Sequence, residues 1–138
     1  MALLKEIKHN NGVVGVYHRI AGINKNYNKL IVDVESYADS TYRDKEKERI
    51  TLSGQIGDLI SKLSVVTGSP QTDETVREAK EIEEKLEYYN GLCAIKQYYA
   101  FKTSVELEYE EGDDISFEAI YEKLTNSDTD FANAETVE

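Results

Sequence analysis

Apolar and polar residues alternate with a period of two over much of residues 1–38, which is typical of β-strands with one buried face. The alternation is clearest between Leu30 and Val34, where every second residue is apolar. Asn10–Gly12 marks a hairpin turn, because Asn and Gly adopt positive φ readily. The polar, Asn-rich residues 24–28 mark a loop. These signals predict a three-stranded antiparallel meander.

The period changes to three and four residues between positions 50 and 93, which predicts two helices. The apolar stripes of the two helices are Ile56, Leu59, Ile60, Leu63 and Val66, then Val76, Ala79, Ile82, Leu86, Tyr89 and Cys93. Gly68 suits a helix C-terminus and Pro70 a helix start. Two neighbouring helices with one narrow stripe each predict an antiparallel αα-hairpin. The polar residues 39–49 are typical of a solvated connector or a first helical turn.

The period of two returns over residues 94–109 and predicts one long strand, which would pair with the N-terminal meander. A short amphipathic helix follows, with Asp114 or Ser116 as its cap and four apolar residues at helical spacing: Phe117, Ile120, Tyr121 and Leu124. From position 126 the chain is polar and predicts an acidic tail in which Phe131 is the only large apolar residue.

The predicted fold class is therefore α+β. We expect a small antiparallel β-sheet of about four strands, an inserted antiparallel αα-hairpin and a short C-terminal helix. Residues 1–138 would form a single domain with four segments: meander 1–38, helical hairpin 50–93, strand and helix 94–125, and acidic tail 126–138.

Charge narrows the classes of partner. The formal net charge is -11, and the stretch from Glu106 onward holds twelve acidic residues against the single Lys123. Binding to a nucleic-acid backbone requires Lys and Arg, so the sequence argues against nucleic acid as a partner. The same acidity disfavours anionic lipid, and no apolar stretch approaches the length of a membrane span.

Cys93 is the only cysteine, which rules out an intramolecular disulfide and predicts a buried small hydrophobic residue. The opening run Ala2–Leu4 is too short for a signal peptide. The sequence therefore predicts a soluble protein made in a reducing cytoplasm.

The stretch Tyr17–Ile20, "YHRI", places a histidine beside an arginine in a valine-rich region. Strand alternation sends His18 and Arg19 to opposite faces, so the two side chains cannot form one site unless the strand bulges. We expect His18 to pack and to be hydrogen-bonded on the apolar face. Arg19 would be solvated, or would pair with a neighbouring subunit or domain.

Other residues that could suggest a catalytic, phosphate-binding or metal-binding site are better explained by structural roles. His9 and His18 lie on neighbouring predicted strands, but no metal-ligand spacing supports a metal-dependent hydrolase. Gly12 and Gly15 do not form a phosphate loop, because no lysine follows them and no helix begins there. Asp113–Asp114 fits a helix cap better than a calcium loop. The sequence therefore predicts no catalytic residue, no metal site and no cofactor.

Ten tyrosines and no tryptophan suggest a surface adapted to protein contacts, since tyrosine combines apolar area with a hydroxyl. Ordinary packing in strands and core explains the same count equally well. The residues proposed for interfaces are Tyr17, Arg19, Leu59, Leu63, Ile82, Leu86, Tyr89, Tyr98 and Phe131.

Both ends of the chain resemble a family of small tail- or baseplate-associated structural proteins of phages that infect Gram-positive bacteria. The resemblance rests on Met1–Ile7, Asn11–Val13, Tyr17–Ile20, Ile23–Lys25, Ile31–Tyr37, Arg43–Glu48, Tyr98–Glu108, Ala119–Leu124 and Phe131–Val137. It covers about residues 1–49 and 94–138, whereas residues 50–93 look like a helical insertion into the common core.

The resemblance implies a non-enzymatic component of a phage virion, in the tail, the baseplate or the region of fibre attachment. Its partners would be further copies of itself and other phage structural proteins, after synthesis in the host cytoplasm. The acidic end of the chain supports an alternative, an adaptor or regulatory module that binds a basic protein.

Overall fold

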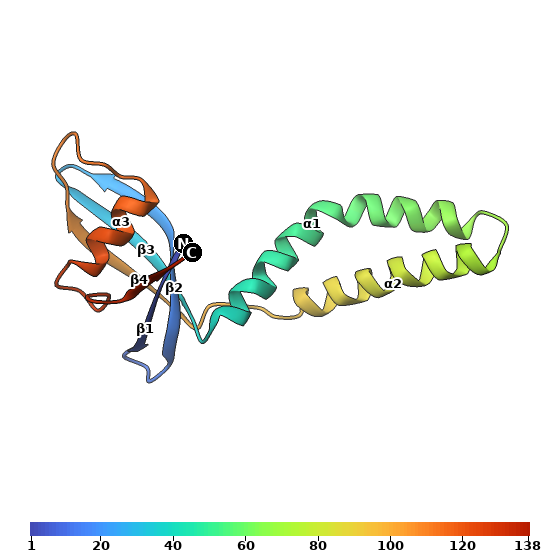
Figure 1. Cartoon of the computed structure of the whole chain (residues 1–138), viewed down its shortest axis with the longest axis horizontal. Coiled ribbons are helices and arrows are strands. Elements are labelled where there is room, and N and C mark those ends of the chain that lie inside the picture. Colours follow the sequence, from blue (N-terminus) through green and yellow to red (C-terminus); the bar gives the residue numbers. More distant parts are fainter. The chain divides into compact units, whose positions relative to one another are not determined.

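The computed structural model describes all residues, 1–138. The elements are β1 (Ala2–Lys8), β2 (Val14–Asn26), β3 (Lys29–Tyr37), α1 (Ser40–Thr67), α2 (Asp73–Cys93), β4 (Phe101–Glu108), α3 (Phe117–Thr125) and β5 (Glu135–Val137) (Figure 1). They confirm the α+β class, with an antiparallel sheet, an inserted helical hairpin and a short C-terminal helix. The chain divides into a sheet unit, Met1–Arg43 with Tyr99–Glu138, and a hairpin unit, Asp44–Tyr98.

The sheet has five strands in the order β4-β3-β2-β1-β5, and every neighbouring pair is antiparallel. The fifth strand corrects the prediction of an acidic tail, because Glu135–Val137 pairs with β1 in the register Leu3↔Thr136. Phe131 is only 2% exposed, and its ring lies edge-on to that of His18 at a centroid distance of 5.2 Å. Phe131 and Ala134 therefore belong to the core of the sheet unit, and the residues after them form an edge strand.

Strand bounds differ from the prediction at two places. The expected loop over residues 24–28 shrinks to a tight turn, because β2 continues to Asn26 and β3 begins at Lys29. The long strand predicted from residue 94 begins only at Phe101. Before it, the hydroxyl of the buried Tyr98 donates a hydrogen bond to a carbonyl oxygen at the end of α2, which ties this segment to the hairpin unit.

The core forms between one face of the sheet and α3. Its buried residues are Leu3, Ile7, Ile20, Leu30, Val32, Val34, Phe101, Leu107, Tyr109, Ile120, Tyr121, Leu124, Phe131 and Ala134. Of the two predicted caps, Ser116 is the one that caps α3, accepting a hydrogen bond from the Ala119 N–H. Gly15 is required by packing, because a Cβ there would lie 2.9 Å from Cε1 of Phe101.

The first helix of the hairpin begins earlier than predicted. Helix α1 starts at Ser40, where the Asp39 carboxylate accepts a hydrogen bond from the Thr41 N–H, so residues 40–49 are helical rather than a connector. At the start of α2, Thr72 and Thr75 form a reciprocal capping box.

Packing between the helices is thin. Within the predicted stripes only Leu59 is buried, whereas Ile60 and Val76 are more than half exposed. The stripe of α2 ends at the buried Leu92, so the expectation that Cys93 is buried was wrong. A two-helix hairpin has no third element to cover its seam, which explains why its apolar residues remain partly in water.

We predict that Phe131→Ala lowers the free energy of unfolding by about 3–5 kcal/mol, the usual cost of removing a buried phenylalanine side chain. The measurement is urea denaturation of the full chain, followed by circular dichroism. Phe117→Ala is the matched control, because Phe117 is 56% exposed and should change stability by less than about 1 kcal/mol. Equal effects of the two substitutions would contradict the core position of Phe131.

Candidate functional site

His18 is fully buried, and both of its ring nitrogens are engaged within the sheet. Nε2 lies 2.7 Å from the carbonyl oxygen of Lys5 in β1, and Nδ1 lies 2.7 Å from Oγ of Ser36 in β3. A carbonyl oxygen only accepts, so Nε2 carries the proton and Nδ1 accepts from the Ser36 hydroxyl. Burial is the main cause that lowers the pKa of His18 below its ordinary value of 6.5. This confirms the prediction of a packed, hydrogen-bonded histidine.

Arg19 lies on the opposite face of β2 and is paired within its own sheet. Its NH2 group donates to Oε2 of Glu35 at 3.1 Å, and its Nε donates to the Tyr37 hydroxyl at 3.0 Å. The Tyr37 hydroxyl also donates to the same carboxylate oxygen, and Tyr17 meets the Tyr37 ring edge-on. The arginine head therefore has partners without a second subunit.

His9 stacks on the ring of Phe101 at a centroid distance of 4.7 Å. The structure brings together no group of three or more His, Cys, Asp or Glu side chains that could hold a metal ion. The hydrolase hypothesis also requires a free nitrogen on His18, and both of its nitrogens are already bonded.

Asp113 and Asp114 accept hydrogen bonds from backbone N–H groups in the turn before α3. The donors are Glu110 to Asp113 and Ser116 to Asp114, each at 2.9 Å. These bonds hold the pKa of both carboxyl groups below their usual value. The two carboxylates therefore order the turn, while Ser116 is the cap of the helix.

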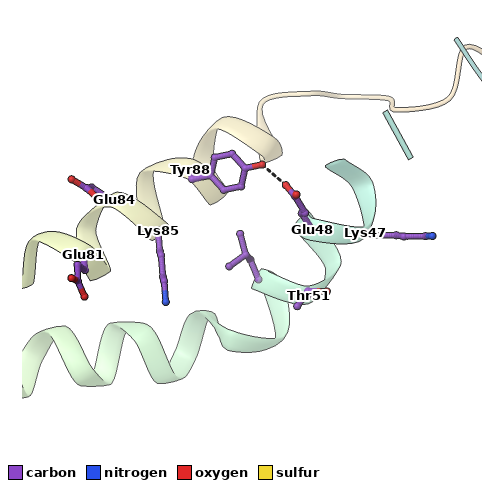
Figure 2. Close-up of a pocket in the computed structure, with 8 residues that line it drawn as sticks. Lys47, Glu48, Thr51, Glu81, Glu84, Lys85 and Tyr88 are labelled. Atoms are coloured by element: carbon purple, nitrogen blue, oxygen red, sulfur yellow. Dashed lines mark hydrogen bonds between the residues drawn. The ribbon is translucent and has the colours of Figure 1, made fainter. Parts of the chain in front are cut away.

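Two hollows lie between α1 and α2 and share Glu81 in their lining, and together we call them the hairpin groove. The larger has a volume of about 660 Å³, and the other, of about 560 Å³, lies nearer the helix–helix turn. Figure 2 shows the larger hollow, where the Tyr88 hydroxyl of α2 donates a hydrogen bond to Glu48 of α1. This bond raises the pKa of Tyr88. The groove is lined by Lys47, Glu48, Thr51, Leu52, Ser61, Lys62, Val65, Val66, Glu78, Glu81, Ile82, Glu84, Lys85 and Tyr88.

The two helices differ in charge. Helix α2 holds seven acidic and three basic residues, whereas α1 has only Asp58 and Lys62 charged over residues 50–67. At helical spacing, the flank of α1 beside its half-buried stripe carries Ile50, Ser53, Gly57, Ile60 and Ser64, which we call the neutral face of α1. Ile50 and Ile60 are both more than half exposed. A solvated helix rarely lacks charge over such a length, so this face is a candidate contact surface.

The residues proposed for interfaces fall into three environments. In the hairpin, Leu63, Ile82, Leu86 and Tyr89 are half-buried between the helices, and Leu59 is buried there. In the sheet unit, Tyr17 and Arg19 are half-buried in the cluster with Tyr37. Tyr98 and Phe131 are buried, so neither presents a surface in this fold.

Sequence reasoning missed the neutral face of α1, although the signal was present as a long stretch with almost no charge. It also missed Tyr27, which is 91% exposed with φ of 55° at the turn between β2 and β3. An exposed aromatic residue with positive φ is unusual, and no spacing rule would have identified it.

The fold and these surfaces define the class as a small α+β protein with a helical hairpin inserted between two paired strands. No protein-family model, no curated protein and no solved structure matches the chain. None of the helices combines the length and the apolar composition needed to cross a membrane.

We predict that the ring of His18 titrates with a midpoint below 6.5, which NMR can follow in His9→Gln, where His18 is the only histidine. The unfolded chain then binds the proton more tightly than the folded chain. The free energy of unfolding should therefore fall as the pH drops below 6.5, by at most about 1.4 kcal/mol per pH unit, until the lowered pKa is passed. A midpoint at or above 6.5 would contradict the buried neutral imidazole.

Proposed function

We propose that this chain is a non-enzymatic structural protein that assembles with copies of itself through the helical hairpin. The observation that carries the proposal is the incomplete packing of that hairpin. Its seam has heptad-like spacing, yet most of its apolar residues are only half-buried, and the neutral face of α1 is left in water.

Association of two hairpins would cover the apolar side chains that one hairpin leaves partly in water. Four helices around one seam form a bundle in which half-buried residues such as Leu63 and Leu86 become covered. Copies of a chain with a net charge of -11 repel each other, and contact through uncharged side chains limits that repulsion. The neutral face of α1 meets this condition, whereas the outer side of α2 does not.

The setting we propose is a phage virion, at the tail, the baseplate or the site of fibre attachment. Support comes from the resemblance over residues 1–49 and 94–138. The engaged ring nitrogens of His18 and the internal pairing of Arg19 are consistent with a structural role. Other phage structural proteins would be the remaining partners.

An acidic adaptor is the second candidate. The sheet unit holds sixteen acidic and eight basic residues, and most of its acidic residues follow Glu106. A basic protein partner would bind there by charge complementarity, and its affinity would fall steeply with salt. Assembly through apolar contact would change much less with salt, so one titration separates the two functions.

We predict that Ile60→Glu weakens self-association of the full chain at least tenfold, because it places a charge in the apolar contact. Sedimentation velocity over a range of concentrations measures the change. Phe117→Glu is the control, because Phe117 has the same exposed fraction of 56% but lies in the sheet unit. Equal loss in both variants, or no self-association of the unmodified chain at any concentration, would refute the assembly role of the hairpin.

The phage setting has a separate test. Mass spectrometry of purified virions, from a phage whose genome encodes this chain, should detect it at many copies per particle. Its absence from particles, together with tight salt-sensitive binding to a basic protein, would favour the adaptor.

A further inference from the structure

The edge strand β4 has a row of open backbone hydrogen-bonding groups. In the antiparallel pair with β3, the Tyr109 N–H donates to the Asn28 carbonyl oxygen at 2.8 Å, which fixes the odd-numbered residues of β4 as the hydrogen-bonded positions. The N–H and C=O groups of the even-numbered residues therefore point away from β3. Lys123 Nζ confirms this geometry, because it reaches the Glu108 carbonyl oxygen from the outside at 3.0 Å.

The outward backbone groups of three residues of this edge remain open, namely Lys102, Ser104 and Glu106. The side chains of these residues are exposed on the face of the sheet opposite the core. Within the sheet, the Lys102 side chain lies 3.9 Å from the Glu35 carboxylate, and the Glu106 carboxylate lies 3.4 Å from Lys29. The opposite edge strand, β5, has three residues in all, so β4 is the longer edge. An open edge of this kind is a template for pairing with another strand unless something blocks it.

We propose that β4 pairs antiparallel with β4 of a second copy, centred on Ser104, so that two sheets join into one. This register sets Ser104 opposite its equivalent in the partner, and Lys102 opposite the partner's Glu106. Each of the three open residues then exchanges hydrogen bonds with the second copy, and each copy places its lysine against a carboxylate.

Charge complementarity indicates that the strand which pairs with β4 is β4 of a second copy. The edge carries Lys102 at one end and Glu106 at the other, with the uncharged Ser104 between them, so it is complementary to itself when reversed. On the core face, the same register sets Thr103 against the partner's Val105, both of which are half-buried at the edge. A shift of two residues would bring in Glu108, whose carbonyl oxygen is already bonded to Lys123.

The contact is distinct from the hairpin contact, although both assume the assembling role proposed above. The deciding variants are Ser104→Pro and Ser104→Ala, made in the full chain that also carries Ile60→Glu. Proline removes an outward N–H that β3 does not use, and proline is tolerated on edge strands. Alanine keeps that N–H and removes only the hydroxyl that donates to Asp33 at 2.7 Å.

With Ile60→Glu alone, we expect a concentration-dependent dimer in sedimentation velocity. Ser104→Pro should weaken that dimer about a hundredfold, while Ser104→Ala should leave it within a few fold. Lys102→Glu or Glu106→Lys alone should weaken it about tenfold by setting like charges opposite, and the double variant should restore it. Thermal melting of each variant checks that the sheet itself remains folded.

The outcomes separate the two contacts. A strict monomer in the Ile60→Glu chain, or equal affinity of the Ser104→Pro and Ser104→Ala variants, would overturn the edge pairing and leave the hairpin proposal standing. Failure of the Lys102 and Glu106 charge exchange to restore the dimer would overturn the proposed register. If Ile60→Glu has no effect and Ser104→Pro added to that chain abolishes association, the hairpin proposal fails and the edge pairing stands.

Discussion

The buried imidazole of His18 ties three strands of the sheet together. The register of β1 against β2 shifts between Leu4 and Ile7, which interrupts the regular ladder near Lys5. Nε2 of His18 donates a hydrogen bond to the Lys5 carbonyl oxygen there, and Nδ1 accepts a hydrogen bond from the Ser36 hydroxyl of β3. Phe131 then closes over the ring from the C-terminal segment. Strand β1, strand β3 and the C-terminal segment therefore all contact the His18 side chain of β2.

The sequence predicts those parts of the fold in which apolar residues recur with a regular period. Alternation is reliable where a strand has one face on the core and one in water, as in β3, where Leu30 and Val34 are buried. Periodicity also located α3, and one of its two predicted caps, Ser116, is the cap in the structure. Alternation does not predict the register shifts within β1–β2 and β2–β3. Such a shift depends on which distant group donates a hydrogen bond to the carbonyl oxygen that the ladder leaves unpaired. Strand β5 has only three residues, too few to establish any period.

The sequence predicted the helical hairpin itself. It did not predict where the hairpin begins and ends, or which of its surfaces is exposed. Residues 40–49 form a helix whose polar side chains surround it, and such a segment has no apolar period to detect. Residues 94–100 continue an apparent alternation without being a strand, because Tyr98 packs with the hairpin unit instead. The pairing of Arg19 with Glu35 and Tyr37 depends on strand register, which residue types alone do not specify.

The hairpin joins β3 to β4, and these two strands are neighbours in the sheet, paired from Ser36↔Phe101 to Lys29↔Glu108. The sheet therefore specifies where the insertion begins and ends but places no requirement on its length. Each heptad added to or removed from both helices would move the helix–helix turn by about 10 Å and keep the seam in phase. The insertion can thus act as a molecular ruler, whose reach could change in evolution by whole heptads while the five-stranded sheet stays the same.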